Sequence, residues 1–293
     1  MQSEVVPHPT SAAATQVDPR VGGIAHALQA LRAIVLREVF KFTQQTGRLV
    51  SALVRPLLWL AVFAAGFRNV FGVAIVEPYD TYIAYDLYIA PGLVGMVMLF
   101  NGMQSSLAMV YDREMGMMRL LLTAPLPRAW ILFCKLVATA VLSLLQALAF
   151  VIVAALLGTQ LPFFGWHLLH VIAATTAAAL MLGALGLLLS VNIKQLENFA
   201  GTMNFVIFPM YFMSTALYPL WKLEESGATW VYQLARVNPF THAVEWMRFA
   251  LYDKDPGASP WVVLGCLALF FGIACWGYDP QRGFGGLTKR GGG

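Results

Sequence analysis

Charged side chains are scarce in this sequence. Only 12% of its 293 residues are Asp, Glu, Lys or Arg, whereas 59% are hydrophobic, and the mean hydropathy is +0.67. An ordinary soluble domain carries about 25% charged residues. The composition therefore argues against a soluble globular protein and predicts a single, all-α domain embedded in a membrane.

Reactive motifs are also missing. The sequence has no Gly-x-Ser-x-Gly elbow, no His-Glu-x-x-His motif and no Asp inside a predicted span, so we expect no catalytic residue, no metal site and no enzyme activity of its own. It also lacks the Gly-x-x-x-x-Gly-Lys-[Ser/Thr] phosphate loop, so active transport would need a separate motor polypeptide. His167 and His170 could bind a metal or haem, but next to Trp166 they are more typical of an interfacial anchor.

Cysteine is almost absent. Cys134, Cys266 and Cys275 lie in or beside apolar runs, and they are interpreted as small buried side chains and not as a disulfide framework. The net charge is +4, but no dense basic patch occurs, so nucleic acid is not an expected partner. Residues 1–20 lack the pattern of a cleaved signal peptide, and we expect both 1–20 and 279–293 to form flexible cytoplasmic tails.

Long apolar runs dominate what is present. The run from 136 to 193 contains no Asp, Glu, Lys or Arg and is too long for one crossing, and Gly158, Pro162 and Gly165 divide it. Arg55 lies near one end of the first run, where its side chain could reach the headgroups. The sequence predicts six transmembrane helices, at about 49–67, 87–111, 136–158, 168–191, 199–221 and 260–278.

The basic residues predict the orientation. Fourteen of the 19 Lys and Arg residues fall on the side that holds both termini and the loop after 111, so this side is expected to be cytoplasmic. Before the first span, residues 21–48 are expected to form an amphipathic interfacial helix, with an apolar stripe at Ile24, Leu28, Leu31, Val35, Val39 and Phe42. The alternative is a surface helix on a soluble core, for which little soluble chain remains.

The long outer connector, 222–259, mixes apolar and charged residues. We expect short helices that dip part-way into the outer leaflet, with Glu245 and Arg248 paired across one turn. The alternative is an amphipathic helix resting on the outer surface. At the middle of the membrane the spans have only neutral polar groups, and Asn101, Gln104 and Asn204 are candidates for a substrate path. Together with Gln146 they could equally hold helices together.

A charged connector, Asp112 to Arg128, separates the second and third predicted spans. This connector, with Ala90-Pro91-Gly92-Leu93 before it and Asn238-Pro239-Phe240-Thr241 after it, resembles the type-2 membrane domain of ABC exporters of the daunorubicin-resistance and nodulation-factor kind. The likeness runs from about Arg37 to Tyr278. It implies a permease of the bacterial inner membrane, homodimeric or paired with a relative, whose ATP and Mg are bound by a separate ABC ATPase subunit.

The resemblance also assigns roles to residues. It implies a cytoplasmic coupling helix that docks the ATPase, formed by Asp112, Arg113, Glu114, Gly116 and Arg119, and an outer re-entrant gate that contains Asn238, Pro239, Glu245 and Arg248. A plain solvated turn is the alternative for the connector. An ion-coupled secondary carrier, or a metal- or haem-handling protein based on the two histidines, would be the alternative function.

The substrate is left open by the residues, since drugs, lipids, glycans and small metabolites all fit an apolar path with scattered amides. A row of tyrosines, Tyr79, Tyr82, Tyr85 and Tyr88, could stack on sugar rings or form an interfacial belt.

Overall fold

The computed structural model describes residues 23–44, 46–67, 78–79, 84–114, 127–159, 167–193 and 195–278. Every regular element within these ranges is a helix, as the composition predicts. The helices are α1 Ile24–Gln44, α2 Thr46–Phe67, α3 Tyr85–Glu114, α5 Arg128–Leu156, α6 Leu168–Asn192, α7 Leu196–Phe212, α8 Leu220–Glu225, α9 Thr229–Val237, α10 Pro239–Leu251 and α11 Ser259–Gly277.

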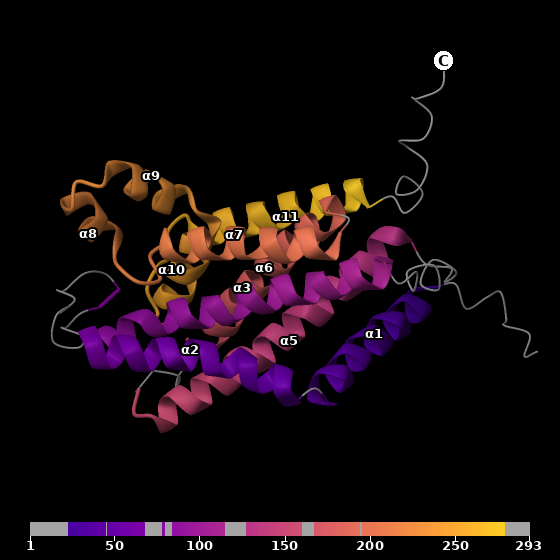
Figure 1. Ribbon diagram of the computed structural model, residues 1–293, viewed down its shortest axis with the longest axis horizontal. Coiled ribbons are helices and arrows are strands. Elements are labelled where there is room, and N and C mark those ends of the chain that lie inside the picture. Colours follow the sequence, from indigo (N-terminus) through magenta and orange to yellow (C-terminus); the bar gives the residue numbers. More distant parts are fainter. Residues whose placement is uncertain are drawn as a thin grey trace, which may run out of the picture.

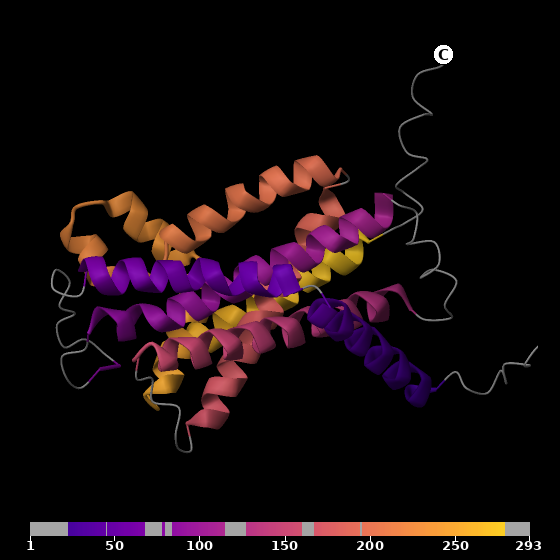
Figure 2. The same cartoon turned by 60° about the horizontal axis from the view of Figure 1, so that its bottom comes forward.

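The long helices run alternately between two ends of one bundle (Figure 1). The short helices α8, α9 and α10 lie at one end. The opposite end holds α1, the end of α3 and the start of α7, and α11 also ends there (Figures 1 and 2). The charged connector therefore begins at the end of the bundle where α1 lies.

Four of these helices are long and apolar enough to cross a membrane: α3, α5, α6 and α11. They coincide with four of the predicted spans, although α5 begins earlier than expected, at Arg128. The other two predicted spans correspond to α2 and α7, which lie outside this set. The fifth span was predicted to reach residue 221, but α7 ends at Phe212, and the Tyr218 hydroxyl donates a hydrogen bond to the Phe212 carbonyl. A turn and α8 follow.

Two glycines allow α3 and α6 to lie in close contact at the centre of the bundle. An added Cβ at Gly186 of α6 would lie 2.6 Å from the Gly102 carbonyl oxygen, and one at Gly102 would lie 2.9 Å from the Leu182 carbonyl oxygen. Small residues at a crossing let helix backbones approach, and in a membrane this packing takes the place of a hydrophobic driving force. Helices α2, α5, α7, α10 and α11 all pack on the α3–α6 pair.

The amphipathic N-terminal helix is present as α1. It rests on the start of α5, where the Trp130 indole Nε1 donates a hydrogen bond of 3.2 Å to the Ala27 carbonyl oxygen. Of the predicted apolar stripe, the later part faces protein, with Phe42 fully buried, whereas Ile24 and Leu28 are exposed. At a spacing of four residues they share one exposed row with Leu36 and Phe40, and Arg32 lies at the middle of this mixed apolar and basic row. Such a row fits the interfacial interpretation.

The predicted break in the long uncharged run is confirmed. Helix α5 ends at Leu156 and Gly158 follows with φ +99°. This backbone conformation favours glycine, and α6 begins at Leu168.

Candidate functional site

The end of the bundle where α8, α9 and α10 lie contains a buried ion pair. Arg248 Nη1 donates to Glu245 Oε1 at 2.5 Å, one turn away on α10. The Arg248 side chain is only 2% exposed and that of Glu245 is 21% exposed. The predicted pairing across one turn is confirmed. Helix α10 itself packs on α3, α6 and α11, so this part of the predicted outer connector packs on protein.

The guanidinium of Arg248 connects three segments of the chain. Its Nη2 donates to the Thr215 carbonyl oxygen at 2.8 Å and to the Tyr88 carbonyl oxygen at 3.3 Å, and its Cζ lies 4.0 Å from the centre of the Tyr88 ring. A cation over an aromatic face is stabilised by the ring quadrupole. Arg248 therefore fastens α10 to the start of α3 and to the turn after α7.

The tyrosine row is part of this cluster and not of a surface. Tyr79, Tyr85 and Tyr88 are all buried in protein, and the hydroxyls of Tyr85 and Tyr88 donate to the Leu217 and Thr215 carbonyl oxygens at 2.7 and 3.1 Å. Neither the sugar-stacking row nor the interfacial belt is therefore correct for these three residues; Tyr82 lies outside the described ranges. Burial raises the pKa of the Tyr79 phenol above its ordinary value, so this group stays neutral beside Arg248.

Asn238 is the N-cap residue of α10 and also bonds this helix to α7. Its side-chain oxygen accepts a hydrogen bond from the Phe240 backbone N–H at 2.9 Å, as an N-cap residue does, and Pro239 occupies the first helical turn. Its Nδ2 donates to the Met210 and Met213 carbonyl oxygens, both at 2.8 Å. All four residues that the sequence assigned to the outer gate are thus brought together around α10.

The three amides predicted to line a substrate path have different surroundings. Asn101 of α3 is a fully bonded centre: its Nδ2 donates to Ser143 Oγ at 2.8 Å and to the Thr139 carbonyl oxygen at 3.2 Å, and its Oδ1 accepts from Gln146 Nε2 at 3.2 Å. These bonds join α3 to α5, which is the helix-holding role. Gln104 lies one turn further along α3, whereas Asn204 is exposed on α7 and does not line the same pocket.

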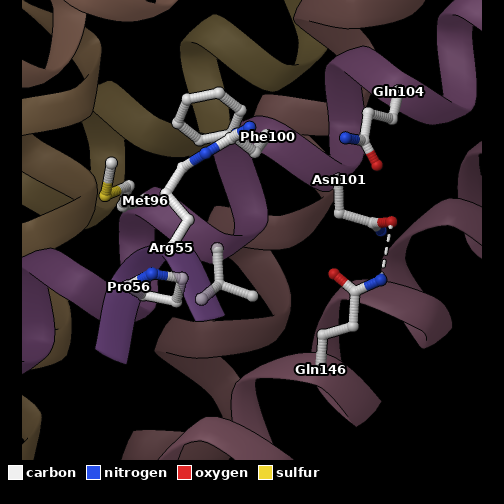
Figure 3. Close-up of a pocket in the computed structure, with 8 residues that line it drawn as sticks. Arg55, Pro56, Met96, Phe100, Asn101, Gln104 and Gln146 are labelled. Atoms are coloured by element: carbon white, nitrogen blue, oxygen red, sulfur yellow. Dashed lines mark hydrogen bonds between the residues drawn. The ribbon is translucent and has the colours of Figure 1, made fainter. Parts of the chain in front are cut away.

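A pocket opens between α2, α3 and α5 (Figure 3). Its polar side consists of Asn101, Gln104 and Gln146, and its cation is Arg55 of α2, whose Cζ lies 3.9 Å from the centre of the Phe100 ring. The expectation from the sequence that the Arg55 side chain reaches the headgroups stays a prediction; in the structure this side chain is exposed and its guanidinium rests on the Phe100 ring.

Of the residues predicted to form the coupling helix, Glu114 is the one whose side chain the structure describes; it is the last residue of α3. Its Oε1 accepts a hydrogen bond of 2.8 Å from the backbone N–H of Leu196, the first residue of α7. Gln195, the N-cap residue of α7, makes no side-chain cap hydrogen bond, so Glu114 supplies an acceptor from another helix. Gly116 and Arg119 lie outside the described residues, as do the side chains of Asp112 and Arg113.

The histidines make no metal site within the described part of the chain. His170 Nδ1 lies 3.2 Å from Asp253 Oδ1 at an exposed position, and no group of three His, Cys, Asp or Glu side chains there could hold an ion. Cys134 is buried and Cys266 and Cys275 are half-buried free thiols.

Comparison with known proteins identifies the family. Residues 29–252 match the family described as ABC-2 type transporter. A protein of Cyanophora paradoxa, provisionally named transport permease ycf38, is 32% identical over 239 residues, which cover 78% of this chain and 76% of the relative. Proteins of the same name from Porphyra purpurea and Pyropia yezoensis are 27% and 29% identical, with the same shares covered. The chain therefore belongs to the ABC-2 type transporter family, whose members are the membrane components of ABC transporters.

Proposed function

We propose that this protein is the permease subunit of an ATP-driven exporter in a bacterial inner membrane, and that a separate ABC ATPase binds and hydrolyses ATP with Mg. Family membership supports the transport role, and the sequence itself has no phosphate loop. In the proposed topology α2, α3, α5, α6, α7 and α11 all cross the bilayer. The alternating course of these helices supports this arrangement, with both termini cytoplasmic (Figure 1).

The observation that carries the proposal is the bond between Glu114 and Leu196. Glu114 stands where α3 passes into the charged connector, and Leu196 begins α7. A movement imposed on the connector by a docked ATPase would pull directly on the first turn of α7. An ATPase can drive the permease only if its contacts with the permease differ in free energy between two states of the permease.

The outer cluster is the proposed gate at the other end. Helix α7 ends at the turn that Asn238 and Arg248 hold from α10, through Met210, Met213 and Thr215. Helix α7 thus links the connector to the α10 cluster. We propose that ATP binding shifts α7 and thereby opens and closes the α10 region on the outer side.

Co-expression with the ATPase tests the assignment. We expect the double variant Glu114→Ala/Arg119→Ala to lose co-purification of the ATPase and substrate-stimulated ATP hydrolysis. Glu225→Ala is the matched control, since it removes an exposed carboxylate on α8, at the opposite end of the bundle, and both measurements should stay unchanged. Full co-purification and full ATPase stimulation in the double variant would contradict the docking role.

A further test separates docking from coupling at Glu114. Glu114→Gln keeps a side-chain oxygen that can accept from the Leu196 N–H, whereas Glu114→Ala removes it. If the bond to α7 transmits the movement, Glu114→Gln should retain more transport per ATP hydrolysed than Glu114→Ala at equal ATPase occupancy. Equal loss in both variants would assign Glu114 to docking charge alone.

An ion-coupled carrier has less support. Such carriers keep ionisable groups near the membrane midplane. Helices α5, α6 and α11 contain no Asp or Glu, and the acidic residues of α3 lie in its first and last turns.

A further inference from the structure

Buried polar atoms without a hydrogen-bond partner are concentrated around α10. Among the described residues they include the hydroxyl oxygens of Tyr211, Thr215 and Thr241, called the unpaired hydroxyls below. All other atoms of this kind in the described part of the chain also fall within residues 79–86, 211–221 and 241–248. These segments are the start of α3 with the residues before it, the end of α7 with the chain after it, and α10.

The buried polar side chains in the middle of the bundle and toward its other end are bonded. Ser106, Thr139 and Ser190 each donate to a carbonyl oxygen of their own helix, at 2.9, 2.9 and 2.8 Å, and Asn101 and Gln146 bond each other. About nine in ten buried polar groups in folded proteins have a partner. The unpaired hydroxyls are therefore a property of the α10 region and not of the whole bundle.

The unpaired hydroxyls belong to segments that pack on one another. Tyr211 lies in the last turn of α7, and its ring centroid is 6.0 Å from that of Phe240 on α10. Thr215 lies in the turn after α7, where its carbonyl oxygen accepts from Arg248 Nη2. Thr241 follows Phe240 on α10, and all three residues are buried. Two unpaired hydroxyls thus belong to the end of α7 and its turn, and one belongs to α10.

A hydroxyl buried in this way has lost its hydrogen bonds to water and has gained none within the protein. It regains a hydrogen bond when the contact that buries it opens to water. Each unpaired hydroxyl therefore lowers the free energy needed to separate α10 from the end of α7. Paired groups raise that free energy, as the Tyr88 hydroxyl does by donating to the Thr215 carbonyl oxygen at 3.1 Å.

We propose that Tyr211, Thr215 and Thr241 set how readily α10 separates from the end of α7, because their hydroxyls are unpaired in the packed state and are solvated by water in an open state. This role rests on the proposed function in that the movement is the opening of the outer gate. Natural proteins break local rules of polar pairing mainly at functional sites, where they give up stability for movement.

Hydrogen–deuterium exchange of the purified permease in phosphatidylcholine nanodiscs tests this role. Tyr211→Phe removes an unpaired hydroxyl and keeps the ring that packs on Phe240. Opening then no longer gains a hydrogen bond to water, so we expect the backbone amides of α10 to exchange about tenfold more slowly than in the wild type, under conditions in which exchange follows the opening equilibrium. Thr215→Val should slow the same amides.

Tyr88→Phe is the matched control, since it removes from the same region a hydroxyl that has a partner and keeps the ring beneath Arg248. We expect it to speed the exchange of α10 amides. The amides of α6 around Gly186 should exchange at the wild-type rate in both variants. Unchanged or faster α10 exchange in Tyr211→Phe, or equal slowing throughout the protein, would overturn the proposal.

Addition of the ATPase separates this role from the gate. If α10 opens in each transport cycle, the complex with Tyr211→Phe should hydrolyse ATP more slowly than the wild-type complex at equal ATPase occupancy. Slowed α10 exchange with a wild-type rate of hydrolysis would contradict the proposed gate and leave the role of the hydroxyls in the packing of α10 standing. The exchange measurement contains no ATPase, so a failed docking assay does not affect it.

Discussion

Arg248 and Glu245 form an ion pair on α10 in which the arginine is the more deeply buried partner, at 2% exposure against 21%. The pair lies between the first turn of α3 and the turn after α7, and Arg248 bonds backbone carbonyl groups of both. Because one guanidinium binds three segments of the chain, the packing of α10 on the bundle depends on a charge that protein surrounds. The loss of Glu245 and the loss of Arg248 should therefore reduce the stability of the protein by different amounts.

The two single substitutions that break this ion pair should destabilise the protein to different extents. Glu245→Gln leaves the buried Arg248 cation without its counter-charge, and Arg248→Met leaves Glu245, which retains some exposure to solvent. Loss of one partner of a buried pair costs about 3–5 kcal/mol. We expect Glu245→Gln to cost the upper part of this range and Arg248→Met the lower part.

The double variant Glu245→Leu/Arg248→Met provides the control for that order. It removes both charges, and we expect it to cost less than Glu245→Gln alone, because no charge is left unpaired. The measurement is the thermal midpoint in detergent, followed with a thiol-reactive dye that labels the buried Cys134 as it becomes exposed. A double variant less stable than both singles would contradict the account.

Substitutions at Asn238 should separate its two roles. Asn238→Asp keeps the oxygen that caps α10 and loses the two bonds to the carbonyl groups of Met210 and Met213, whereas Asn238→Ala loses all three. An N-cap contributes about 1 kcal/mol. Asn238→Asp also places a negative charge beside two carbonyl oxygens, so we expect both variants to lower the thermal midpoint. A midpoint equal to the wild type in Asn238→Asp would show that the bonds to α7 contribute nothing.

The close contact of α3 and α6 predicts a contrast among glycines. Gly102→Ala and Gly186→Ala each place a methyl group within 3 Å of backbone on the facing helix, and overpacking of this kind costs about 1–3 kcal/mol. Gly201→Ala and Gly265→Ala meet open space on α7 and α11 and should be neutral or stabilising by up to about 1 kcal/mol. Thermal midpoints of the four variants test this contrast, and equal losses in both pairs would contradict it.

Much of the helical framework follows from local sequence. The apolar runs predict the positions of α3, α5, α6 and α11 because length and hydropathy alone specify a helix that can cross a bilayer. The pairing of Glu245 with Arg248 was also predictable, because residues three apart meet on one helix face. The end of α7 was not predictable, since Tyr218 bonds the Phe212 carbonyl from beyond the helix and residues 213–221 contain no charged residue that would mark the end of the span.

Contacts between distant segments of the chain could not be predicted from the sequence. The tyrosine row has the spacing of a surface belt, but Tyr79, Tyr85 and Tyr88 are buried where α10 and the turn after α7 pack near the start of α3. Likewise Asn101, Gln104 and Asn204 are equivalent as isolated amides. Their partners distinguish them: Asn101 is bonded to α5, Gln104 faces a pocket, and Asn204 is exposed on α7.

The Asn101 centre should therefore act on stability and not on substrate choice. Asn101→Leu leaves the Gln146 amide without its acceptor and removes the bonds to Ser143 and Thr139, and a buried polar group left unpaired costs about 1–3 kcal/mol. Gln146→Leu breaks one bond and should cost less. Both variants should lower the thermal midpoint while the rank order of transported compounds stays as in the wild type, whereas Gln104→Leu should change that order with little loss of stability. A changed substrate order in Asn101→Leu at wild-type stability would return Asn101 to the substrate path.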